Sequence, residues 1–73
     1  MAKREVGLTF PEELIREPII YTLNQEFGVA TNIFQADISE SGGWVKLEIE
    51  GDEKQLDDAI TWVTSKGVRV DTY

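Results

Sequence analysis

The chain has 73 residues, no cysteine, no histidine and a formal net charge of −7, from fourteen acidic and seven basic residues. A chain of this length forms one domain, buries only about 60% of the surface that its unfolded form exposes, and has no thiols for disulfides or a thiolate metal site. The acidic charge argues against nucleic acid and anionic membranes as partners, and no apolar run reaches the roughly 20 residues that span a bilayer.

The first strand is predicted over residues 5–10, where alternation places Val6, Leu8 and Phe10 on one side. Residues 1–4 include two basic residues, but no apolar segment follows them, so the start of the chain is not a secretory signal. We expect these four residues to form a disordered lead and the protein to be cytoplasmic.

A helix is predicted after this strand. Pro11 ends the strand, and residues 12–15 are expected to form a turn or a short helical lead-in, because Pro18 disfavours a continuous helix through the residue before it. Pro18 suits a first helical turn, and Gly28 is typical of a helix C-terminus. Apolar residues recur between them at helical spacing, at Ile19, Ile20, Leu23 and Phe27.

A β-hairpin is predicted in the middle of the chain. Residues 31–40 and 44–50 both alternate apolar with polar residues, and the short segment between them contains Gly42 and Gly43. The apolar set that the alternation turns toward the core consists of Phe34, Ala36, Ile38, Val45, Leu47 and Ile49. We therefore expect one buried face and one solvent-facing face.

A second helix and a last strand complete the pattern. Asp52 and Gln55 have the spacing of a capping box, which opens a helix. Lys66 and Gly67 mark its end, and residues 68–73 alternate again as a strand. The apolar stripe of this helix contains Leu56, Ala59, Ile60 and Val63.

The predicted element order is β-α-β-β-α-β. With right-handed crossovers in each βαβ half, this order produces a four-stranded antiparallel sheet with both helices on one face. The fold class is therefore α+β, a ferredoxin-like sandwich with the expected strand order 4-1-3-2. Its predicted helix-facing layer contains Val6, Leu8, Phe10, Phe34, Ala36, Ile38, Val45, Leu47, Ile49, Val68 and Val70.

The residues offer little for catalysis or cofactor binding. No histidine is present to activate a serine, and the loop that follows Phe10 is acidic and lacks the glycine amides that cradle an anion. The open face of the third strand has one aromatic, Trp44, beside Glu48 and Glu50, which does not suit RNA bases. We predict no enzyme activity, no metal and no cofactor.

Several apolar residues fall outside the predicted core. The alternation places Ile33, Trp44 and Tyr73 on the open face of the sheet, and Trp62 beside the apolar stripe of the second helix. The second strand is a ten-residue edge without proline or lysine, the residues that usually block pairing of such edges. We predict a homodimer in which this strand pairs with its copy in a continuous eight-stranded sheet.

The hairpin also carries a family resemblance. It resembles the NIL domain, named for an Asn-Ile-Leu triplet at the start of its second strand. The matching triplet is Asn32-Ile33-Phe34, and Phe34 stands where leucine is usual. The first strand and the helix from Pro18 to Val29 fit the family as well, so the resemblance covers almost the whole chain, from about Val6 to Tyr73.

The resemblance implies a regulatory role. NIL domains occur at the C-terminus of the ATPase subunit of methionine ABC importers, where they bind methionine at a domain interface and inhibit transport. This chain has no ATPase motif. It is expected to be either a free-standing NIL protein, which Met1 and the short lead favour, or a domain of a longer chain.

Two hypotheses for function follow. The first is a sensor that binds methionine or a similar amino acid between two protomers, through Asn32, Ile33 and Phe34. Asn32 offers an amide donor and acceptor and Ile33 an apolar wall; alternatively, Asn32 caps the preceding loop and Ile33 is a dry dimer contact. The expected dimer interface contains Ile33, Gln35, Asp37 and Trp44.

The second hypothesis is a protein-interaction module without a metabolite. Its acidic surface and exposed tryptophans would meet a basic, partly apolar protein partner. The residues leave the contact for a ligand carboxylate open, because the basic candidates Lys46 and Arg69 have acidic neighbours in Glu48 and Asp71.

Overall fold

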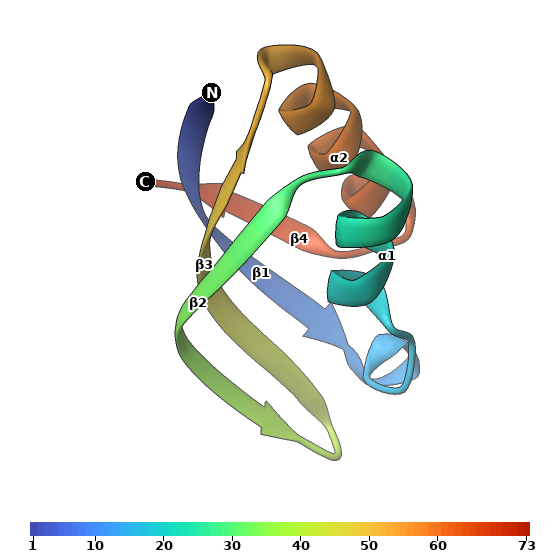
Figure 1. Cartoon of the computed structure of the whole chain (residues 1–73). Helices are drawn as coiled ribbons and strands as arrows, with labels where there is room; N and C mark the ends of the chain where they lie inside the picture. Colours follow the sequence, from blue (N-terminus) through green and yellow to red (C-terminus); the bar gives the residue numbers. More distant parts are fainter.

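Two helices pack on one face of a four-stranded antiparallel sheet in the computed structural model, which describes residues 1–73 (Figure 1). The strand order is β2-β3-β1-β4, which is the predicted order, so the ferredoxin-like α+β fold is confirmed. The elements in chain order are β1 (Ala2–Pro11), the short 3-10 helix η1 (Glu12–Leu14), α1 (Ile19–Phe27), β2 (Ala30–Ser39), β3 (Gly42–Gly51), α2 (Glu53–Ser65) and β4 (Arg69–Thr72). Neither α-helix has the length and apolar content that a membrane crossing requires.

The start of the chain is a strand, so the prediction of a disordered lead was wrong. β1 begins at Ala2, because the long β3 offers backbone partners as far as Gly51, which pairs with Ala2. Arg4 then ties β1 to α2: its Nη2 lies 2.7 Å from Glu53 Oε2 and 2.9 Å from Asp57 Oδ1. The hydrogen bonds that Arg4 donates to Glu53 and Asp57 raise the pKa of its guanidinium above its ordinary value.

The core lies between the helices and the three strands β1, β3 and β4. The predicted helix-facing residues of β1 and β3 are all buried, and Val68, just before β4, is buried too. Leu47 at the centre of β3 and Leu56 on α2 have no exposed surface. The buried apolar residues are Val6, Leu8, Phe10, Ile19, Leu23, Val29, Val45, Leu47, Ile49, Leu56, Ala59, Val63 and Val68.

The helix ends follow the sequence. Gly28 ends α1 with φ of 69°, in the left-handed region that favours glycine. Asp52 and Gln55 form the predicted capping box at the start of α2, with Gln55 N donating to Asp52 Oδ1 at 2.8 Å and Asp52 N donating to Gln55 Oε1 at 2.9 Å. Trp62 on α2 packs against Phe27 with 5.4 Å between ring centroids, so the two helices also contact each other through aromatic rings.

A β-bulge in β2 changes which of its residues face the helices. Ile33 pairs with Leu47 and Gln35 pairs with Lys46, which leaves Phe34 without a partner on β3. Because paired residues share a face of the sheet, Ile33 lies on the helix side, and the prediction that it faces away from the helices was wrong. The extra residue Phe34 shifts the alternation by one position.

The predicted burial of β2 was also wrong. Phe34 and Ile38 are 51% and 53% exposed, and Ala36 is exposed too. Ala36 and Ile38 do lie on the helix side, opposite Val45 and Gly43. No helix covers them, because α1 ends near the start of β2 and the far end of the β2–β3 hairpin projects beyond both helices (Figure 1).

Candidate functional site

An apolar groove lies between β2 and α1. Its volume is about 320 Å³, which falls within the usual range of small-molecule sites. Ile33 and Ile38 form the β2 side, and Ile20 and Tyr21 form part of the α1 side. The groove exists because the sheet is one strand wider than the helical layer, so the apolar residues of β2 have no partner within the chain.

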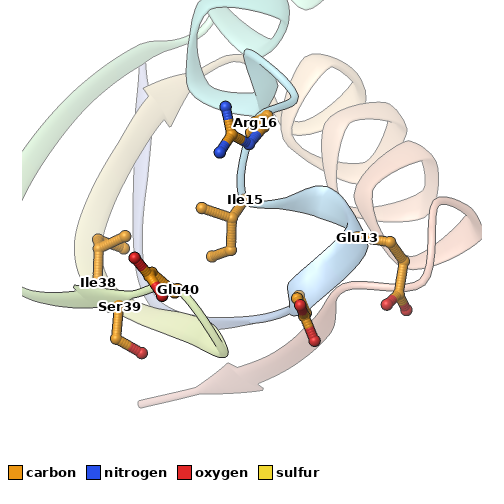
Figure 2. Close-up of a pocket in the computed structure, with 7 residues that line it drawn as sticks. Glu13, Ile15, Arg16, Ile38, Ser39 and Glu40 are labelled. Atoms are coloured by element: carbon orange, nitrogen blue, oxygen red, sulfur yellow. The ribbon is translucent and has the colours of Figure 1, made fainter.

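A second hollow continues the groove at the end of the hairpin. Ile15 and Ile38 line both cavities, and Figure 2 shows these two side chains on either side of the space. The two isoleucines approach over Gly43, where a methyl group would come within 2.6 Å of Ile38 Cδ1 and 3.2 Å of Ile15 Cδ1. The rim is formed by Arg16 and by three carboxylates, Glu12 and Glu13 on the side of Arg16 and Glu40 in the hairpin turn. We call this hollow the hairpin cleft.

The ion pairs of the chain leave Arg16 unengaged. Lys46 Nζ lies 3.1 Å from Glu5 Oε1, so Lys46 pairs with Glu5 and not with its sequence neighbour Glu48. Arg69 Nε lies 3.4 Å from Asp71 Oδ2, which is the neighbour that the sequence suggested. The basic residues in ion pairs are Arg4, Lys46, Lys54, Lys66 and Arg69. The other two are Lys3, on β1, and Arg16, on the rim of the hairpin cleft.

The predicted site residues separate onto two faces. Asn32, Gln35 and Asp37 pair with Glu48, Lys46 and Trp44, so they lie on the open face of the sheet. Of the predicted ligand and interface residues, Ile33 alone lines the groove, and Phe34 stands in the bulge between the two sets. All of these residues except Trp44, which lies on β3, belong to β2, but no single face of the sheet holds them.

The loop before β2 does not depend on Asn32. Asn24 holds it instead, because its Nδ2 donates to the Val29 carbonyl at 2.8 Å and to Thr31 Oγ1 at 3.3 Å. The alternative in which Asn32 caps this loop is therefore wrong. The amide of Asn32 is exposed and takes no part in these bonds.

The open face carries an aromatic pair over a glycine. Trp44 and Tyr73 both lie above Gly7, where a methyl group would come within 3.2 Å of Trp44 Nε1 and 2.8 Å of Tyr73 Oη. Lys46 Nζ lies 5.1 Å from the centre of the Tyr73 ring. Trp44 is half-buried, so part of its apolar surface is already covered within the chain by these neighbours.

Sequence reasoning missed the groove and Arg16. The spacing of Ile33, Ala36 and Ile38, three residues and then two, would have indicated a bulge that keeps all three on one face. Arg16 had no such signal, because it lies in a turn near three acidic residues in the sequence, Glu12, Glu13 and Glu17, without any periodic pattern.

Comparisons with known proteins agree with the fold and the hairpin motif. The NIL domain model matches residues 4–72. The chain is 31% identical over 70 residues to the methionine import ATP-binding protein MetN of Bacillus subtilis, a match that covers 90% of this chain and 20% of that protein. It is 28% identical over 72 residues to the methionine import ATP-binding protein MetN 2 of Bacillus licheniformis, covering 93% of this chain and 21% of that protein.

A solved structure extends the match to three dimensions. The C-terminal domain of an ABC transporter/ATP-binding protein from Enterococcus faecalis superposes with a TM-score of 0.84 at 26% identity, covering 94% of this chain and 81% of that one. The chain spans about a fifth of the length of the curated relatives it matches. It belongs to the NIL domain family.

Proposed function

We propose that this chain is a small regulatory domain that binds methionine or a similar amino acid and acts through a homodimer. The observation that carries the proposal is the solvent-accessible apolar groove beside β2, which has the volume and the lining for an apolar side chain. Membership of the NIL family supports it, as does the similarity to proteins named for methionine import. The proposed role is binding rather than catalysis.

The edge of β2 supports the homodimer. All ten residues of this strand except Thr31 are exposed, and its outer edge pairs with no strand. Asp37 is its single charged residue, in a chain with a net charge of −7. A nearly neutral edge lets two acidic chains approach with little repulsion, and unpaired strand edges favour pairing with a second copy.

The proposed dimer would bring a second apolar strand to the groove, because a two-fold axis perpendicular to the sheet keeps the helix sides of both sheets on the same side. In antiparallel pairing across a two-fold axis, the start of one strand lies beside the end of the other. Ile33 of the partner subunit, which lies on the helix side of its own sheet, would then lie near Ile38 and the hairpin cleft. The ligand would touch both protomers, so that binding and dimerisation would be linked.

Ligand binding is tested by thermal denaturation with L-methionine and a panel of other amino acids. A ligand that binds only the folded state stabilises it by about 2.7 kcal/mol at a hundred times its dissociation constant, which raises the Tm of a domain of this size by roughly 10–20 °C. We expect this rise for methionine, with a dimer in light scattering. The Asn32→Ala variant tests whether the family triplet adds a polar contact from the open face, in which case it shows a much smaller rise. No shift across the panel contradicts the proposed ligand class, and an unchanged shift in Asn32→Ala removes Asn32 from the site.

The cellular setting of the domain is proposed from the relatives that the chain matches. They are ATP-binding proteins of methionine import, and this chain corresponds to about a fifth of their length. We propose a cytoplasmic domain that works with an ABC importer. Regulation of transport by amino-acid binding is part of this proposal.

The open face of the sheet supports a second candidate function, docking of a protein partner. Trp44 and Tyr73 present aromatic surface there, and Glu48 and Glu50 on β3 have no ion-pair partner. Such a face suits a basic, partly apolar protein. In a pull-down from the native host, Trp44→Ala should lose a partner that the unaltered chain retains; an identical set of partners rules Trp44 out.

A further inference from the structure

Arg16 and Glu40 line the hairpin cleft with opposite charges, and the apolar Ile15 and Ile38 lie between them (Figure 2). An amino acid carries an ammonium group, a carboxylate and a side chain on one carbon. We propose that Arg16 binds the α-carboxylate and Glu40 the α-ammonium group of the amino acid whose side chain enters the groove. The inference rests on the proposed function and names the residues that select a zwitterion.

Arg16 is assigned to the carboxylate by elimination and by chemistry. Lys46 and Arg69, the basic residues of the open face, are held by Glu5 and Asp71. Lys3 is also without an ion pair, but it lies on β1 opposite Glu50, away from both cavities. Arg16 is the one unpaired basic residue on the rim, and its planar guanidinium matches a carboxylate with two parallel hydrogen bonds.

Glu40 is assigned to the ammonium group by its place in the hairpin. It lies in the turn between β2 and β3, next to Ile38 and Ser39 of the same wall, and forms no ion pair within the chain. Arg16 stands on the other wall, after η1. Glu12 and Glu13 also line the cleft, but on the wall of Arg16, so Glu40 is the one carboxylate that faces Arg16 from the opposite wall. A cation and an anion on facing walls orient a zwitterion.

The apolar link between the cavities sets the direction of the ligand. Ile15 and Ile38 belong to both the hairpin cleft and the groove. A ligand held at its charged end by the rim therefore extends its side chain past Ile38 toward Ile33 and Ile20. An unbranched apolar side chain, which can adapt its torsions, suits a groove that is entered between two isoleucines.

The test uses three ligands on the full chain, with dissociation constants from calorimetry. L-Methionine carries both charges, L-methioninamide lacks the carboxylate, and N-acetyl-L-methionine lacks the ammonium group. Arg16→Gln should weaken L-methionine about tenfold and leave L-methioninamide unchanged. Glu40→Gln should weaken L-methionine by a similar factor and leave N-acetyl-L-methionine unchanged.

Matched control variants separate the effect of these two contacts on affinity from the effect of a change in net charge. Lys3→Gln and Glu26→Gln remove the same charges from exposed residues that line neither cavity, and neither should change the affinity for L-methionine. If Arg16→Gln and Glu40→Gln behave like these controls while L-methionine binds, the inference is overturned and the proposed function stands. Tighter binding of L-methioninamide than of L-methionine also overturns it, because a cation site would replace the zwitterion site. Absence of binding by every amino acid overturns both.

Discussion

Ile38→Asp is expected to abolish the stabilisation of this protein by L-methionine, with the dissociation constant rising at least about a hundredfold. Ile38 lines both the groove and the hairpin cleft, so its side chain contacts any apolar ligand that enters from the rim. A carboxylate there would lose its hydration when the ligand binds and would replace the apolar surface that faces the ligand side chain. The substitution should cost the fold only about 1 kcal/mol, because Ile38 is already 53% exposed.

Tyr73→Asp is the matched control for this variant. It adds the same charge at an apolar residue that is 65% exposed, but on the open face of the sheet. Calorimetry with L-methionine and thermal denaturation without it should distinguish the two variants. The groove is not the binding site if both variants bind methionine like the unaltered chain, or if Tyr73→Asp weakens binding as much as Ile38→Asp.

Leu47→Ala is expected to have the largest effect on folding, a loss of about 3 kcal/mol in the free energy of unfolding. Leu47 has no exposed surface, and its removal leaves a cavity at the centre of β3, between the sheet and both helices. Domains have about 0.05–0.15 kcal/mol of stability per residue, or roughly 4–11 kcal/mol for a chain of this length. The Tm should therefore fall by roughly 12–24 °C.

Ile33→Ala is the comparison that tests the architecture of β2. Ile33 is the register partner of Leu47 on the same face of the sheet, yet it is 51% exposed. We expect its truncation to cost only about 1 kcal/mol in the unliganded protein. Urea denaturation of both variants provides the free energies. Equal losses would mean that β2 is covered, contrary to the arrangement described above.

The fold was predictable from local patterns, and the apolar groove beside β2 was not. Alternation in the four strands, the capping box at Asp52 and the glycine at position 28 each indicated an element that the structure contains. Phe34 shows where such patterns fail. Strict alternation assigned it to the core, whereas the bulge leaves it unpaired and returns Ile33 to the helix side. A single inserted residue reverses the faces on one side of the insertion, because the side-chain period of a strand is two.

The sequence by itself determined the order of the elements, the topology of the sheet and the family, because these depend on periodicity, capping residues and a short motif that are all local. Only the tertiary structure decided which apolar residues are covered. A helix nine residues long extends over only part of a ten-residue hairpin strand, so the apolar side of β2 remains open as a groove. The tertiary structure also decided which basic residue is without an ion-pair partner at the rim of the hairpin cleft. Lys46 and Arg69 pair with acidic residues on the sheet, whereas Arg16 pairs with none.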